Sequence, residues 1–88
     1  MKLNKNFVLR NIAGESMLIP VGEASGKVNG IISLNGSGVL IWNALSENFD
    51  RDLAARKLTE EYEVGFDKAL EDVDAFIGRM SELGLVEE

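Results

Sequence analysis

The sequence predicts an α+β domain in which a three-stranded antiparallel sheet is followed by three helices, in the order β-β-β-α-α-α. Short apolar runs separated by glycine-containing turns fill the chain up to residue 34, which is typical of strands. Beyond residue 35, apolar residues recur at helical spacing, most regularly from 66 to 83. Because 88 residues lie within the usual size range of one globular domain, we expect a single domain over residues 1–88.

The composition excludes several classes of active site. The chain has no cysteine and no histidine, which removes disulfides, thiolate nucleophiles, iron–sulfur ligation and the commonest general acid/base. Nine Lys and Arg against fifteen Asp and Glu give a net charge of −6, which disfavours nucleic acid and anionic membranes as partners. No secretory signal or membrane span is apparent, so we expect a cytoplasmic protein.

The first two strands are expected on either side of a tight turn at residues 13–15. Alternation places Phe7 and Leu9 on one side of the first strand, and Met17 and Ile19 on one face of the second. Pro20 belongs near a strand end because it cannot donate to a ladder.

A loop and a third strand complete the predicted sheet. Residues 22–30 contain three glycines and no apolar pattern, which predicts a flexible loop. The run "IISL", residues 31–34, then predicts a third short strand.

Three helices follow, and two of them begin with good capping residues. Asn35 precedes a segment that is apolar almost all round, and Asp50 precedes "RDLAARKLTEEY". The third helix has the clearest periodicity and ends before Gly84, a suitable C′ residue. Its apolar positions are Phe66, Ala69, Leu70, Val73, Phe76, Ile77, Met80 and Leu83.

The glycines between the third strand and the first helix raise the question of a phosphate-binding corner. A dinucleotide fingerprint needs a third glycine where this chain has Ile41, and a P-loop needs a Gly-Lys-Ser/Thr ending that is absent. We therefore interpret Gly36 and Gly38 as residues that permit a sharp, capped helix start.

A small sheet with three helices also suggests a winged helix, a fold that often binds DNA. The cations Arg51, Arg56 and Lys57 are followed at once by the acidic run "TEEYE", and the third helix is mainly acidic. DNA binding needs several uncompensated cations on one face, so this reading is disfavoured. Glu71, Asp72 and Asp74 lie together on one helix and read as a solvated face rather than as an acid/base pair.

The third strand is the feature that points to binding. In a simple meander it lies at the sheet edge, and it carries none of the prolines, lysines or charges that normally protect an edge. An open edge beside an apolar helix face is what β-augmentation by a peptide requires. Spacing alone leaves two alternatives: another part of the chain covers the edge, or the edge pairs with a second copy.

Three stretches of the chain form an ordered combination of motifs. They are "SLNGSGVLIWNALSE", "LAARKLTEEYEV" and "LEDVDAFIGRMSELGLV", with Leu34–Asn35 before the first helix, Tyr62 ending the second and Leu83–Gly84–Leu85 closing the third. From about Phe7 to Val86, this combination resembles the PqqD-like family, peptide-binding domains also called RiPP recognition elements.

The resemblance implies a winged-helix-like, non-catalytic domain without a cofactor. Family members bind the leader segment of a ribosomally made precursor peptide as an added strand and present it to a modifying enzyme, often a radical SAM protein. Carried onto this chain, the peptide would pair with Ile31, Ile32, Ser33, Leu34 and Asn35. Its apolar side chains would meet Val73, Phe76, Ile77 and Met80, and its acidic residues would pair with Lys68 and Arg79.

Two departures from the family pattern affect these expectations. The link from the second to the third strand is longer and richer in glycine than usual, which would reshape the groove mouth or hinge a strand exchange between two copies. The first helix also begins more loosely, with Gly36-Ser37-Gly38. The runner-up function is a winged-helix protein-interaction or transcription-regulatory domain with weak or no DNA binding, and a third is a dimerisation module.

Overall fold

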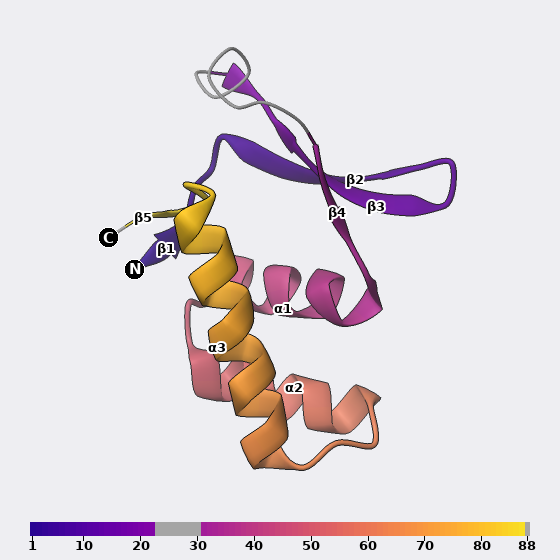
Figure 1. Ribbon diagram of the computed structural model, residues 1–88, viewed down its shortest axis with the longest axis vertical. Helices are drawn as coiled ribbons and strands as arrows, with labels where there is room; N and C mark the ends of the chain where they lie inside the picture. The colour runs from indigo at the N-terminus through magenta and orange to yellow at the C-terminus, as the bar shows by residue number, and fades with distance from the viewer. Residues whose placement is uncertain (23–30, 88) are drawn as a thin grey trace.

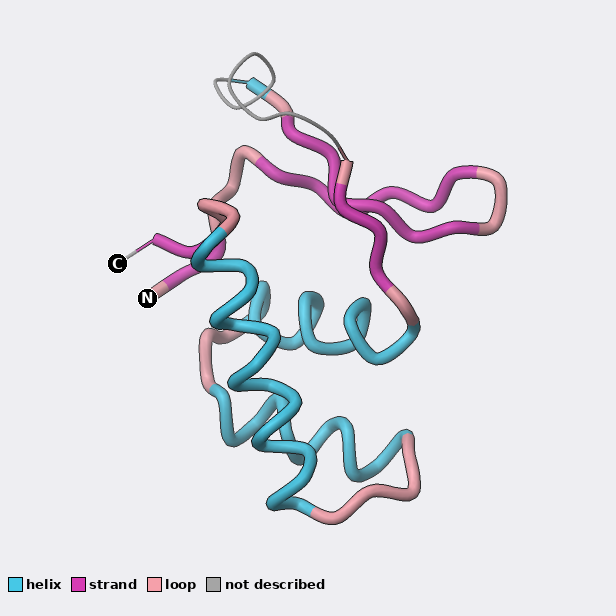
Figure 2. Tube along the Cα trace, in the orientation of Figure 1, coloured by secondary structure: helices cyan, strands magenta, loops and turns pink. Residues whose placement is uncertain are grey.

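The computed structural model describes residues 1–22 and 31–87, and it confirms the predicted order of sheet and helices (Figures 1 and 2). The loop predicted at 22–30 lies, from residue 23 onwards, outside the described residues. The main sheet has the order β2-β3-β4 and is antiparallel throughout. Its strands are β2 (Phe7–Ile12), β3 (Glu15–Pro20) and β4 (Ile32–Leu34), and the helices are α1 (Gly36–Glu47), α2 (Arg51–Glu61) and α3 (Phe66–Glu82).

A second, two-stranded sheet joins the ends of the chain and was not predicted from the sequence. β1 (Lys2–Leu3) pairs antiparallel with β5 (Val86–Glu87). The Asn4 amide also donates to the carbonyl oxygen of Leu85 at 2.7 Å. Two-residue strands carry too little periodicity to be recognised by pattern, and this pairing holds the C-terminal end of α3 beside the start of β2.

The two faces of the main sheet have different surroundings. Phe7, Leu9 and Leu18 lie on the inner face, where Phe7 and Leu18 are buried against the helices. Met17 and Ile19 share the opposite face and are half-buried. The sheet therefore contributes one apolar face to the core, as expected for a small antiparallel sheet beside a helical layer.

The capping residues confirm the predicted starts of α1 and α2. The Asn35 side chain accepts a hydrogen bond from the Gly38 amide at 2.8 Å, and the Asp50 side chain accepts from the Asp52 and Leu53 amides. Each cap satisfies amide groups that would otherwise have no partner in the first turn of the helix.

A Schellman arrangement ends α3 at Gly84, as the sequence predicted. Gly84 has a φ of 84°, and its amide donates to Ser81 while the Leu85 amide donates to the Met80 carbonyl at 2.8 Å. The side chains of Met80 and Leu85 are both fully buried in the same cluster, which adds the hydrophobic contact that accompanies this motif.

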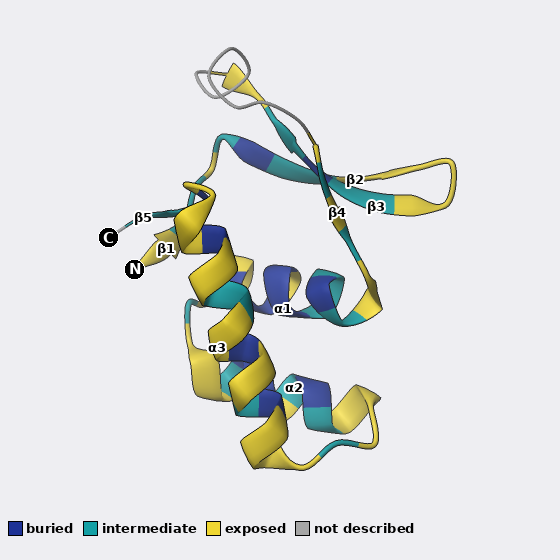
Figure 3. Ribbon diagram, viewed as in Figure 1, coloured by how far each residue is buried: buried dark blue, intermediate teal, exposed yellow. Residues whose placement is uncertain are grey.

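The core consists of two adjoining hydrophobic clusters. One lies among the three helices and includes Ile41, Leu58 and Val73. The other lies between the main sheet and the helices and includes Leu18 and Trp42. Figure 3 shows exposed residues on much of the α3 surface turned toward the viewer, while its buried residues lie where it meets the other helices.

Candidate peptide-binding groove

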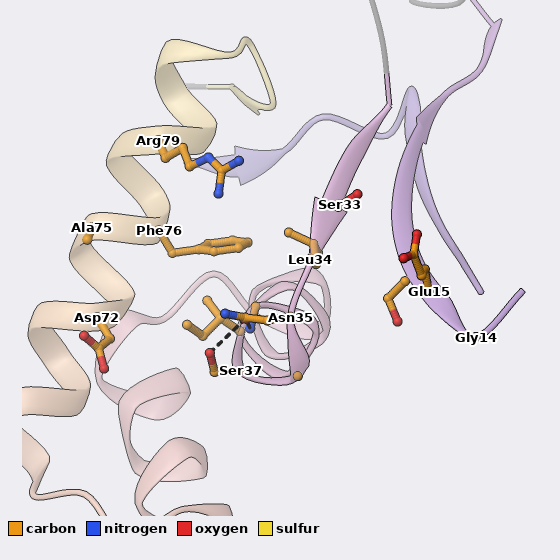
Figure 4. A pocket seen from close by; sticks show the side chains of 14 residues that line it. Gly14, Glu15, Ser33, Leu34, Asn35, Ser37, Asp72, Ala75, Phe76 and Arg79 are labelled. Atoms are coloured by element: carbon orange, nitrogen blue, oxygen red, sulfur yellow. Dashed lines mark hydrogen bonds between the residues drawn. The ribbon is translucent and has the colours of Figure 1, made fainter. Parts of the chain in front are cut away.

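A groove of about 910 Å³ lies between β4 and α3 (Figure 4). The start of α1 forms its floor, and the turn between β2 and β3 extends its lining on the far side of β4. The lining residues are Gly14, Glu15, Ser16, Ser33, Leu34, Asn35, Gly36, Ser37, Gly38, Ile41, Asp72, Ala75, Phe76 and Arg79.

The geometry of the β2–β3 turn determines which backbone groups of β3 point toward β4. Ala13 and Gly14 both have positive φ, at 54° and 83°, which is the two-residue turn typical of hairpins. Such a turn makes the flanking residues Ile12 and Glu15 a hydrogen-bonded pair, and every second pair repeats this pattern. At the other end of the hairpin, the Val21 amide donates to the Asn6 carbonyl oxygen, and this pair continues the same series of hydrogen-bonded pairs in steps of two.

The same alternation leaves backbone groups of β4 directed away from the sheet. Since Met17 directs its backbone groups to β2, Ser16 and Leu18 direct theirs to β4 and pair with Leu34 and Ile32. The N–H and C=O groups of Ser33 and the C=O group of Ile31 therefore point outward. No described strand pairs with that edge, so it can accept a further strand.

The α3 wall of the groove is formed by one stripe of the helix. Asp72, Ala75, Phe76 and Arg79 follow the spacing i, i+3, i+4, i+7, so they project from the same side. Figure 4 shows the Phe76 ring directed at Leu34 of β4. Phe76 also packs against both core clusters, which holds the ring in place at the centre of the wall.

Glycine at the start of α1 allows the floor to approach β4. A Cβ atom on Gly38 would lie 3.2 Å from the Asn35 side-chain oxygen and 3.4 Å from the Leu34 side chain. One on Gly36 would lie 3.0 Å from the hydroxyl of Tyr62. These glycines serve close packing at the corner, in agreement with the structural interpretation of "NGSG".

The charges around the groove are unevenly compensated. Lys68 donates to Asp72 at 2.9 Å, and this hydrogen bond raises the pKa of Lys68 above its ordinary value. Within residues 1–22 and 31–87, the Arg79 side chain makes no ion pair and no side-chain hydrogen bond. Among the described residues, Arg79 is therefore a cation on the groove wall without a compensating charge.

The structure brings together about half of the site residues expected from the sequence. Ser33, Leu34, Asn35, Phe76 and Arg79 line the groove. Ile31 is 54% exposed at the open edge of the sheet, and Ile32 is half-buried on its inner face.

The remaining expected residues lie elsewhere. Val73 and Met80 are 0% exposed inside the core and contribute no surface to the groove. Ile77 is half-buried against the helical cluster, and Lys68 lies outside the lining and pairs with Asp72.

Several lining residues were not expected from the sequence. Asp72 and Ala75 belong to the Phe76 stripe at i−4 and i−1, a signal that the apolar periodicity of α3 obscured. Ile41 reaches the floor from α1, while Glu15 and Ser16 reach the lining from β3. Only the tertiary arrangement brings these elements together.

The described residues provide no group of three or more His, Cys, Asp or Glu side chains suited to hold a metal ion. In the same part of the chain, every helix is too short or too polar to span a bilayer.

The chain belongs to the PqqD family. Residues 8–86 match the family described as "Coenzyme PQQ synthesis protein D (PqqD)", which confirms the resemblance over nearly the whole chain. Among curated proteins, no sequence matches significantly.

Two solved structures share the fold. One is "TbiB1 in Complex with the TbiA(beta) Leader Peptide", with a TM-score of 0.80 and 22% identity over 99% of this chain and 95% of that one. The other is "Lasso peptide synthetase B1 complexed with the leader peptide", with a TM-score of 0.81 and 23% identity over 99% and 96% of the two chains. The TM-scores establish the α+β fold that this chain shares with both structures, and at this low sequence identity the similarity shows the fold alone.

Proposed function

We propose that this protein is a non-catalytic binding domain that captures the leader segment of a ribosomally made precursor peptide. The leader adds to β4 as a fourth strand, and the domain presents the attached core peptide to a separate modifying enzyme such as a radical SAM maturase. The observation that carries the proposal is a β4 edge that no described strand pairs with, directly beside a groove. Membership of the PqqD family and the leader peptides in both similar structures support it.

Backbone hydrogen bonds supply the first part of the binding energy. The outward C=O group of Ile31, the N–H and C=O groups of Ser33 and the backbone N–H of Asn35 form a ladder of donors and acceptors for a strand of four or five residues. Because main-chain groups make these bonds, they hold the peptide without selecting its sequence.

Side chains in the groove supply selectivity. Every second residue of an added strand faces the inner side of the sheet, where Leu34, Ile41 and Phe76 offer an apolar seat. Val73 and Met80 support this seat from within the core and are not part of the proposed contact surface.

The whole described chain acts as the binding unit, and chemistry is left to the partner enzyme. Tethering the leader raises the effective concentration of the core peptide at that enzyme. A short strand on a preformed edge should bind with an affinity on the order of micromolar, which allows release after modification.

The test is an amide NMR titration of the labelled domain with the leader half of a precursor peptide encoded beside it. We expect selective shifts at residues 31–35 and at Asp72–Arg79, with small shifts in α2. The core half of the same precursor serves as the matched control and should leave these signals in place.

Three other outcomes would contradict the proposal. Shifts at Arg51–Lys57 with DNA and none with the leader would support the regulatory alternative, and salt separates the two because DNA binding falls steeply with ionic strength. Shifts at the β4 edge that depend only on protein concentration would indicate pairing between two copies. The absence of shifts with any probe would also count against a leader-binding domain.

A further inference from the structure

The charge pattern of the groove narrows the class of peptide that it accepts. This inference rests on the proposed function, since it concerns the same groove. Arg79, Phe76 and Asp72 lie in that order down the α3 wall, and Figure 4 shows Arg79 near the level of Ser33 and Asp72 near the level of Ser37.

Within the part of the chain that the structure describes, one end of this stripe carries a charge without an ion-pair partner. Asp72 receives a hydrogen bond from Lys68, so the two charges compensate each other at the lower end. Arg79 has no such partner among the described residues. A guanidinium on the wall of a groove is a natural partner for a carboxylate.

The spacing of the stripe matches that of an added strand. Phe76 and Arg79 are separated by about 4.5 Å along the helix axis, and Phe76 and Asp72 by about 6 Å. Residues two apart on a strand lie about 6.8 Å apart and face the same side. A peptide residue seated on Phe76 therefore has its neighbours two positions away at the levels of Arg79 and Asp72, and the long arginine side chain covers the remaining difference.

The direction of the added strand determines whether the peptide residue at the level of Phe76 comes before or after the one at the level of Arg79. Both pairings of the sheet are antiparallel, and antiparallel pairing is slightly more stable per residue than parallel pairing. An antiparallel peptide runs from the Asn35 end of β4 toward the Ile31 end, and thus from Phe76 toward Arg79.

We propose that the groove selects a leader in which an apolar residue is followed two positions later by Asp or Glu. The apolar side chain sits among Leu34, Ile41 and Phe76, and the carboxylate pairs with Arg79. At the position two before the apolar residue, a small uncharged polar side chain fits best, because Asn35, Ser37 and the compensated Asp72 line that end.

The test measures the affinity of the fluorescein-labelled leader half of the neighbouring precursor by anisotropy. Arg79→Glu should weaken binding about fivefold or more. The matched control is Arg56→Glu, which changes the net charge equally at an exposed position of α2 and should leave the affinity within about twofold.

A charge-exchange series in the leader identifies the contact. Each acidic residue of the leader is replaced by Lys in turn and titrated against Arg79→Glu. Affinity should recover only for the acidic residue two positions after the apolar residue whose change to Ala costs most.

Several results would overturn the inference while leaving the proposed function intact. These are unchanged binding by Arg79→Glu, recovery at another spacing, recovery at an acidic residue before the apolar one, or tight binding of a leader with no acidic residue at that position. If the unaltered leader does not bind the unaltered domain, the proposed function fails as well, and the two failures are thereby distinguished.

Discussion

Phe76 of α3 points across the groove at Leu34, the last residue of β4 (Figure 4). Leu34 is followed at once by Asn35, whose side chain caps α1, and Phe76 packs against both core clusters. The helix cap and the core therefore fix the two sides of the groove independently of any peptide. A groove held open in this way lowers the ordering cost of binding.

The outward direction of the Ser33 amide can be tested with proline. Ser33→Pro removes a donor from the open edge but none from the β3–β4 ladder. We expect leader affinity to fall about fivefold or more, while the helical circular dichroism stays unchanged. Ser33→Ala keeps the amide and should bind like the unaltered domain. Equal affinity for the proline variant would contradict strand addition at this edge.

Met80 should matter for stability and not for peptide contact. Its side chain is fully buried, so Met80→Ala should lower the free energy of unfolding by about 2–5 kcal/mol, as measured by urea denaturation. Leader affinity of the folded fraction should stay the same. Weaker binding at unchanged stability would show that Met80 is exposed to the peptide. Met80→Glu should prevent folding, because it buries an unpaired charge.

Asn35 should stabilise α1 through its side-chain oxygen. Asn35→Ala removes the acceptor for the Gly38 amide and should cost about 1 kcal/mol in denaturant unfolding. Asn35→Asp retains an acceptor at the same place, so its free energy of unfolding should fall much less. An equal loss in both variants would mean that the capping bond contributes nothing.

The ion pair between α2 and α3 should make stability depend on acid pH. Arg51 donates two hydrogen bonds to the Asp74 carboxylate, at 2.7 and 2.5 Å, and they lower the pKa of Asp74 below its ordinary value. A folded pKa below the unfolded one means that the contribution is complete above the unfolded pKa, near 4, and is lost as pH falls through the folded pKa. The midpoint temperature of thermal unfolding should therefore fall less between pH 6 and pH 2 for Asp74→Asn than for the unaltered protein. If the unfolding temperatures of the two proteins fall in parallel with pH, the ion pair does not contribute to the acid dependence of stability.

Local interactions account for what the sequence alone determined. The α+β order, the capping residues Asn35 and Asp50, the helix end at Gly84 and the edge position of β4 were all predicted correctly. The element types, the caps and the helix end depend on residues within a few positions of one another, through periodicity, capping or backbone conformation, whereas the edge position of β4 follows from its place as the last strand of a meander. Such signals can be read along the chain without knowing what packs against each element.

Long-range packing decided the rest. Leu3 pairs with Val86 at opposite ends of the chain, and no local pattern indicates such a pairing. The apolar stripe of α3 was visible in the sequence, but not which of its residues the rest of the fold would cover. Val73 and Met80 became core, while Ala75 and Asp72 beside Phe76 became groove. Helical periodicity specifies a face, but the elements that approach that face determine where the core ends and a binding surface begins.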